Sequence, residues 1–222
     1  MSSLRNVIYQ FWAGNADMTG DRLKCYTESK DVFGVKTELI TPDNLSDYVV
    51  RGHPIHKAYP YLSPNHKSDY VRCYLLRFHG GGYADIRRYS RENNWSEQFE
   101  LLANTAYADI VGEPENARWA AFPTYRDEEH ASRLVICGYL IGKADTPFTR
   151  MWYDRVIQYL DVMYPLIREN PSPDSRSAQG YPIPHFGLMG FPFHYTCYKI
   201  TGVRPNAVLR SLRSGRTNDR YR

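Results

Sequence analysis

Two acidic residues and two arginines between positions 69 and 87 have the types and spacing needed to bind a phosphorylated, hydroxyl-rich ligand. Asp69 and Arg72 are three residues apart, so a helix would place both side chains on one face. Asp85 and Arg87 are two residues apart, so a strand would point both the same way and turn Ile86 toward the core. Carboxylates accept hydrogen bonds from sugar hydroxyls or bind a divalent cation, and arginine neutralises phosphate. Either pair alone is also explained by a surface ion pair, but together they indicate one site.

The glycine run Gly80–Gly82 stands between these two pairs, but it does not form a phosphate-binding loop. Such loops run from a strand through glycines into a helix, so that the helix N-terminus faces the anion. Here a predicted helix precedes the glycines, and a predicted strand over residues 83–86 follows them. Gly80 suits the left-handed position after a helix, and the other two glycines allow a close backbone approach. The strand would then present its acid and its arginine at the carboxyl edge of a sheet, where doubly wound folds bind ligands.

Residues 68–86, with the sequence SDYVRCYLLRFHGGGYADI, resemble the nucleotide-sugar motif of DxD-type glycosyltransferases with the GT-A fold. The families that this segment resembles are the capsular polysaccharide synthesis glycosyltransferases and the sugar-binding-region DxD family, which includes yeast mannosyltransferases. The resemblance extends more distantly to large clostridial glucosylating toxins, and glycosyltransferases of large algal viruses share the pattern. The opening IYQFWAGN is similar to the first strand of these enzymes. The resemblance is good over residues 5–90 and looser over residues 134–200.

This resemblance implies an enzyme of polysaccharide biosynthesis. Such an enzyme moves a sugar from a nucleoside-diphosphate donor, expected to be a UDP-sugar, to a hydroxyl of a glycan acceptor. The resemblance further implies that Phe11 or Trp12 contacts the uracil-type base. Asp69 and Arg72 would bind ribose or donor-sugar hydroxyls and help to hold the diphosphate. Asp85, as the first acid of the DxD motif, would contact ribose, sugar or metal.

Arg87 departs from the DxD pattern, because it occupies the position of the second acid, which is the principal metal ligand in these enzymes. Two explanations stay open: either Asp85 holds Mn²⁺ or Mg²⁺ together with groups from elsewhere, or the arginine takes over part of the electrostatic task. Growing negative charge on the departing diphosphate has to be stabilised in both cases. Asp85 and Arg87 are therefore the expected catalytic residues. His185 or His194, in a late proline-rich loop, is a candidate metal ligand, although a lone histidine is more often structural.

A non-catalytic nucleotide-sugar-binding module of the same fold is the alternative, because Arg87 would remove metal-dependent chemistry. Such a module would hold a UDP-sugar without releasing UDP. The acidic run Asp127–Glu129 is interpreted as a solvated turn, which also contains possible general bases for an inverting transfer. A retaining enzyme needs no such base, and the sequence leaves the stereochemistry open.

The elements that would position these residues alternate between strand and helix along the chain. Strands are predicted at residues 6–12, 35–41, 83–86, 119–122 and 134–137, and helices at 20–30, from Ser63 or Asn65 to about Phe78, at 97–108 and at 147–164. Ser96 is the predicted cap of the third helix, and Asp145 or Thr146 that of the fourth. Residues 170–193 read as a long proline-rich loop that would shape the acceptor cleft. This order predicts an α/β sandwich around a mainly parallel central sheet, which the resemblance makes a GT-A, Rossmann-like fold.

Length and composition fit one intracellular domain. We expect residues 1–209 to form a single glycosyltransferase domain, with 1–90 as the nucleotide-sugar half, 91–209 as the acceptor half and 210–222 as a basic tail or linker. The net charge is +4 over 222 residues and five arginines lie in that tail, so the body lacks the basic stripe of a nucleic-acid-binding protein. The chain shows no signal peptide and no apolar run of about 20 residues, which predicts a cytoplasmic protein (host cytoplasm if viral) without a transmembrane segment. The oligomeric state is left open.

Overall fold

The structure, a computed structural model, describes residues 3–14, 17–116, 127–175 and 178–217, and its centre is a mixed sheet in the order β2-β1-β3-β5-β4-β6. The strands are β1 (Val7–Phe11), β2 (Lys36–Ile40), β3 (Gly81–Ala84), β4 (Ile110–Pro114), β5 (Val135–Gly142) and β6 (Val208–Leu209). Each neighbouring pair is parallel except those that β5 makes with β3 and β4. The prediction of an α/β fold around a mainly parallel sheet is therefore confirmed. The predicted strand at residues 119–122 lies outside the described residues.

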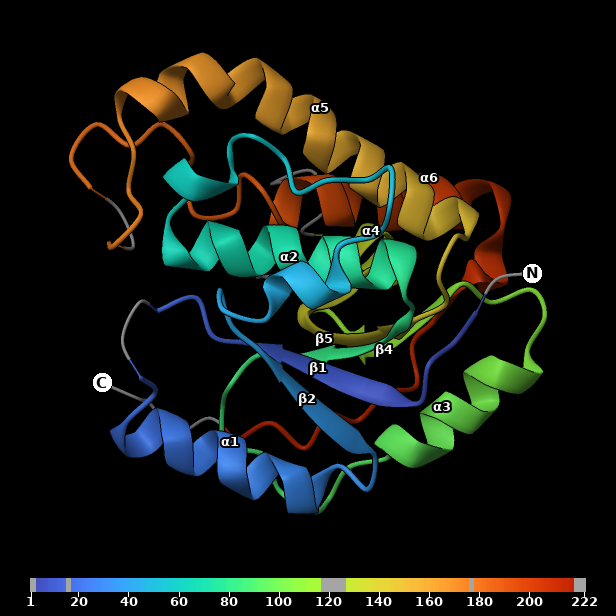
Figure 1. Cartoon of the computed structure of the whole chain (residues 1–222). Coiled ribbons are helices and arrows are strands. Elements are labelled where there is room, and N and C mark those ends of the chain that lie inside the picture. Colours follow the sequence, from blue (N-terminus) through green and yellow to red (C-terminus); the bar gives the residue numbers. More distant parts are fainter. Residues whose placement is uncertain (1–2, 15–16, 117–126, 176–177, 218–222) are drawn as a thin grey trace.

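Helices cover both faces of this sheet (Figure 1). Helices α1 (Gly20–Val32) and α3 (Trp95–Asn104) lie on one face. Helices α2 (Pro64–Phe78), α5 (Pro147–Glu169) and α6 (Gly190–Val203) lie on the other, where α5 packs against both α2 and α6. A short helix, α4 (Glu128–Ala131), precedes β5. The main apolar core lies between the sheet and this second helical layer.

Helix α2 begins and ends where the sequence predicts. Ser63 is extended, and its hydroxyl accepts a hydrogen bond from the backbone N–H of His66 at 3.3 Å. The helix ends at Phe78, and Gly80 follows with a φ of 65°, the left-handed conformation that glycine adopts without strain. Val71, Tyr74 and Leu75 on its apolar face are fully buried. Arg72 on the opposite face is 4 % exposed as well, because the helix is enclosed between the sheet and α5.

Strand β3 begins two residues earlier than predicted and ends before Asp85. Its first residue, Gly81, has a φ of 122°, and a Cβ there would lie 2.9 Å from the Val7 carbonyl oxygen. A Cβ on Gly82 would lie 3.0 Å from the Ile8 side chain of β1. The glycines are therefore part of the strand, where the missing side chains let β3 pair closely with β1.

The C-terminal half departs most from the sequence prediction. Helix α5 begins after Thr146, whose reciprocal hydrogen bonds with Thr149 cap it as predicted, but it continues through Pro165 to Glu169. Helix α3 begins at Trp95, and Ser96 does not cap it, because the Ser96 hydroxyl donates instead to the Gly34 carbonyl at 3.2 Å.

Strands β4 and β6 and helix α6 were not predicted. β4 contains Gly112 and Pro114, which weaken a strand pattern, and β6 is only two residues long. Helix α6 begins at Gly190, inside the segment predicted as a loop, with Pro192 in its first turn, where proline is tolerated. Of the residues predicted as a loop, the described ones before α6 (170–175 and 178–189) lie outside helices and strands.

The beginning of the predicted basic tail packs against the domain. Leu212 and Ser214 are both 1 % exposed, and the Ser214 carbonyl accepts a hydrogen bond from the Trp95 indole at 3.1 Å. Arg210, Arg213 and Arg216 alternate with these residues and are exposed. Residues 210–217 thus differ from a solvated tail. In the described part of the chain, no helix has the length and apolar character to cross a membrane.

Candidate functional site at the carboxyl ends of β1 and β3

The site lies where the direction of strand connection reverses. The connection from β1 to β2 runs through α1 on one face of the sheet, and the connection from β2 to β3 runs through α2 on the other face (Figure 1). Because the two helices leave in opposite directions, a crevice opens at the carboxyl ends of β1 and β3. A cavity of about 550 Å³ lies there.

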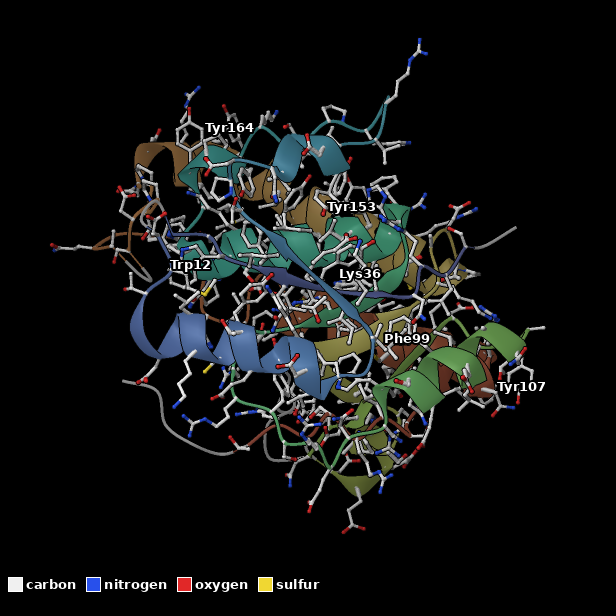
Figure 2. All side chains as sticks on the ribbon, turned by 60° about the horizontal axis from the view of Figure 1, so that its bottom comes forward. Trp12, Lys36, Phe99, Tyr107, Tyr153 and Tyr164 are labelled. Atoms are coloured by element: carbon white, nitrogen blue, oxygen red, sulfur yellow. The ribbon has the colours of Figure 1, made fainter. Side chains whose placement is uncertain are left out.

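Seven of the sequence-predicted site residues line this cavity: Phe11, Trp12, Asp69, Arg72, Asp85, Arg87 and His185; the alternative metal ligand His194 does not. They come from the end of β1, from α2, from the segment after β3 and from the loop before α6. Trp12 lies at the end of β1 beside α1 (Figure 2), where it packs with Ile86 and Met18. Residues far apart in the sequence are therefore gathered around one ligand-sized space.

Arg72 is the charged centre of the site. Its guanidinium donates to Asp85 Oδ1 at 2.9 Å and lies 3.5 Å from Asp69 Oδ1. It also donates to the Cys137 carbonyl of β5 and lies 4.2 Å from the centre of the Tyr83 ring. The Arg72 side chain is 4 % exposed, so these contacts fix the guanidinium and its two carboxylate partners relative to one another. The surface ion pair considered for Asp69 and Arg72 is excluded.

Burial changes the proton affinity of this cluster. Burial raises the pKa of Asp69 to about 7; Arg72 opposes the rise and Asp85 adds to it. Burial disfavours the charge on Arg72, but Tyr83, Asp85 and Asp69 together raise the pKa of the guanidinium above its usual value. The arginine therefore stays charged, while Asp69 exchanges its proton near neutral pH.

The backbone after β3 is held in place from three sides. Asp85 donates its N–H to the Gly138 carbonyl at 3.0 Å, and its own carbonyl accepts from the Tyr89 hydroxyl at 2.8 Å. Arg22 of α1 donates to the Ile86 carbonyl at 2.5 Å. Arg22 also lines the cavity, and sequence reasoning missed it, because its spacing to the motif carries no signal without the fold. The sequence feature that could have indicated Arg22 is its position in the first turn of the helix that follows β1.

Arg87 lines the same cavity as Asp85, although both residues follow the end of β3 and do not lie in the predicted strand. Its Nε lies 3.8 Å from Asp85 Oδ2, which is longer than a hydrogen bond, and its side chain is 38 % exposed. Ile86 between them is 6 % exposed and faces the core. Arg87 therefore offers its guanidinium to the cavity, whereas the guanidinium of Arg72 is buried behind the acids.

The expected metal ligands Asp85 and His185 line the same cavity, but the surrounding groups do not complete a site for Mn²⁺ or Mg²⁺. No three His, Cys, Asp or Glu side chains within the described ranges are grouped so that they could hold a metal ion. His194 is buried in α6, and its Nε2 lies 3.7 Å from Glu115 Oε2. A cation here would need most of its ligands from phosphate oxygens and water. Metal dependence stays a prediction.

The acidic run Asp127–Glu129 does not line the cavity. Asp127 caps α4, because its carboxylate accepts a hydrogen bond from the backbone N–H of His130 at 2.8 Å. All three acids of the run are exposed, as expected, but Glu128 and Glu129 form the start of helix α4 and not a turn. The run is therefore no source of a general base at this site.

A second cavity of about 550 Å³ adjoins the first and shares Asn65 and His185 with it. The rest of its lining comes from His66 and from residues 181–184 of the proline-rich loop. Nδ1 of His66 lies 2.9 Å from the Tyr181 hydroxyl, and burial lowers the pKa of His66 to about 4. A neutral, aromatic- and proline-walled space thus borders the charged one.

No protein-family model, no curated protein and no solved structure matches the chain. The resemblance of residues 68–86 to DxD-type glycosyltransferases therefore stays a prediction.

Proposed function

We propose that the protein is a glycosyltransferase of the GT-A type, which moves a sugar from a UDP-sugar to a hydroxyl of a glycan. The observation that carries this proposal is the set of side chains that line the first cavity. Aromatic side chains for a base, carboxylates for sugar hydroxyls and a guanidinium for phosphate meet at the reversal point of the sheet. Few classes of ligand need all three kinds of group, and a nucleotide sugar is one of them.

The proposed placement follows the order of these groups along the cavity. The base lies against Phe11 and Trp12 at the end of β1, where aromatic faces favour stacking. The diphosphate lies toward Arg87, and the donor sugar lies toward Asp69 and Asp85, which accept hydrogen bonds from its hydroxyls. Arg72 contacts both carboxylates and acts as a positioning residue, because it sets the distance between them.

The chemistry requires one bond to form and one to break. The acceptor hydroxyl oxygen bonds to the anomeric carbon, and the bond from that carbon to the diphosphate oxygen breaks, with its electron pair staying on UDP. The hydroxyl proton passes to a carboxylate of the site or to the departing diphosphate. Cationic groups near the diphosphate accelerate the step, since they stabilise charge that grows in the transition state.

The second cavity is the proposed binding site of the acceptor. It opens beside the donor cavity and is bounded by the loop over residues 181–185, which the sequence assigned to the acceptor cleft. Its aromatic and proline walls suit the apolar faces of sugar rings. An acceptor bound there would approach the donor across Asn65 and His185, which line both spaces.

The test is UDP release from a panel of UDP-sugars, with and without Mn²⁺ and with mixed oligosaccharides as acceptors. Asp85→Ala should abolish release, whereas Asp31→Ala, at an exposed position of α1, should leave release unchanged. If UDP and UDP-sugars show no affinity under either condition and Asp85→Ala changes nothing, the proposal fails.

A non-catalytic nucleotide-sugar-binding module remains the second candidate. Two observations favour it: Arg87 occupies the position of the second DxD acid, and the described side chains around it do not complete a metal site. The same assay separates the two functions. A binding module holds the UDP-sugar without releasing UDP, whereas an enzyme releases UDP and shortens the lifetime of the bound donor.

A further inference from the structure

The described lining of the first cavity carries more positive than negative charge. It contains the three guanidinium groups of Arg22, Arg72 and Arg87 but only the carboxylates of Asp69 and Asp85. Carboxylates that hold a divalent cation have to present free oxygens toward it. Here Oδ1 of Asp85 already accepts from Arg72 at 2.9 Å, and Oδ2 faces Arg87 at 3.8 Å. Guanidinium groups therefore stand on both sides of the acid that would be the metal ligand.

We infer that this cavity binds a diphosphate through guanidinium groups, with Arg87 as the contacting cation, and that it does so without needing a divalent cation. The identity of the ligand rests on the proposed function, but the mode of anion binding rests on the charges just described. The planar fork of an arginine forms two parallel hydrogen bonds with phosphate oxygens, and such charge-assisted bonds are about twice as strong as neutral ones.

The three arginines differ in what they can contact. Arg72 is 4 % exposed, and its guanidinium contacts two acids and the Cys137 carbonyl. It therefore adds positive electrostatic potential to the cavity but does not contact the ligand directly. Arg22 donates to the Ile86 carbonyl and so fixes the backbone next to Arg87. Arg87 itself is 38 % exposed at the cavity wall, and its contact with Asp85 is too long for a hydrogen bond. Arg87 is therefore the group that reaches the ligand.

The experiment measures binding of UDP and of inorganic pyrophosphate by calorimetry, once in EDTA and once in Mn²⁺. Wild-type protein should bind each probe with similar affinity in both solutions. Arg87→Ala should weaken both probes by roughly 10- to 100-fold in EDTA, the loss expected for one charge-assisted contact. Arg87→Lys should recover only part of the loss, because a point charge cannot form the two-bond fork. Arg91→Ala, at an exposed arginine outside the cavity lining, is the matched control and should bind like wild type.

The sharpest variant is Arg87→Asp, which places a second carboxylate beside Asp85. It should lose binding in EDTA and regain it in Mn²⁺, because two acids in this spacing can hold a cation against the phosphates. Wild-type binding that requires Mn²⁺, or an Arg87→Ala variant that binds as wild type does in EDTA, would overturn the inference. Metal-free, Arg87-dependent binding of pyrophosphate without any affinity for UDP would uphold the inference and overturn the proposed function.

Discussion

Removing the guanidinium of Arg72 should destabilise the fold and should do so more at high pH than at low pH. The proposed change is Arg72→Met, which keeps much of the volume of the side chain but leaves the buried acids without their cation. Asp85 Oδ1 loses a 2.9 Å partner, Asp69 loses the charge 3.5 Å away, and the Cys137 carbonyl loses a donor.

The size of the effect follows from the burial of the partners. Removing one member of a buried ion pair costs about 3–5 kcal/mol. Asp85 is 29 % exposed, so water replaces part of the lost interaction, and we expect the lower value of about 3 kcal/mol at pH 8. For a domain of this length, that lowers Tm by about 6–12 °C.

The pH dependence comes from Asp69, whose pKa burial raises to about 7. The folded pKa lies above the unfolded one, so the stability linked to this carboxyl falls as pH rises from about 4 to 7. Above pH 7 the ionised carboxylate relies on Arg72, whereas at pH 5 it is protonated and loses little when the arginine is removed. The cost of Arg72→Met should therefore be smaller at pH 5 by about 1 kcal/mol, which corresponds to roughly one pKa unit.

Urea unfolding at pH 8 and pH 5 measures both quantities. The matched control is Arg77→Met on the same helix, because Arg77 lies 2.6 Å from Asp145, whose side chain is 51 % exposed and keeps Arg150 as a second partner. That change should cost less than about 1 kcal/mol at either pH. A loss below 1 kcal/mol for Arg72→Met, or a loss that is equal at the two pH values, would refute the described role of Arg72.

Three further predictions concern Gly80 after helix α2, Trp12 as the proposed stacking partner of the base, and the buried His66. Gly80→Ala should lower the free energy of unfolding in urea by at least about 2 kcal/mol. The backbone there is left-handed, and the added Cβ would also lie 2.5 Å from the Ser3 carbonyl oxygen. Gly52→Ala, also at positive φ but in open space, should cost only about 1 kcal/mol, and equal costs would contradict the close approach. Trp12→Ala should weaken UDP by about 1–3 kcal/mol in calorimetry and leave pyrophosphate unchanged; a loss for both would place the base elsewhere. Burial lowers the pKa of His66 to about 4, so stability should fall as pH drops from 6.5 toward 4, and His66→Gln should flatten the urea-unfolding profile there. An unchanged slope would contradict the neutral buried state.

The first half of the fold could be predicted from the sequence because its signals are local. The N-cap at Ser63, the helical spacing of α2 and the left-handed glycine after it each depend on residues a few positions apart. The order of strand and helix then placed the motif at the carboxyl ends of β1 and β3. Asp69 and Arg72 share a face of α2 as their spacing predicts, whereas Asp85 and Arg87 follow the end of β3 and do not lie in the predicted strand.

The other elements and site residues could not be predicted, because they depend on contacts between residues far apart in the sequence. Strand β4 carries Gly112 and Pro114 and is stabilised by its neighbours β5 and β6. Helix α6 starts with a glycine and a proline, and its helical state comes from packing on α5 and the sheet. Arg22 reaches the site across 64 residues of sequence separation, so no spacing could reveal it. The burial of Arg72 likewise required knowing that its side of α2 packs on the sheet, against Tyr83 of β3 and the Cys137 carbonyl of β5.

The most direct test of the central claim is a crystal structure of the protein with UDP-glucose. The proposed function predicts the uracil ring against Trp12 or Phe11, the diphosphate oxygens within hydrogen-bond distance of Arg87, and the sugar hydroxyls toward Asp69 and Asp85. A nucleotide bound outside the cavity at the ends of β1 and β3, or bound there with its phosphates turned away from Arg87, would contradict it.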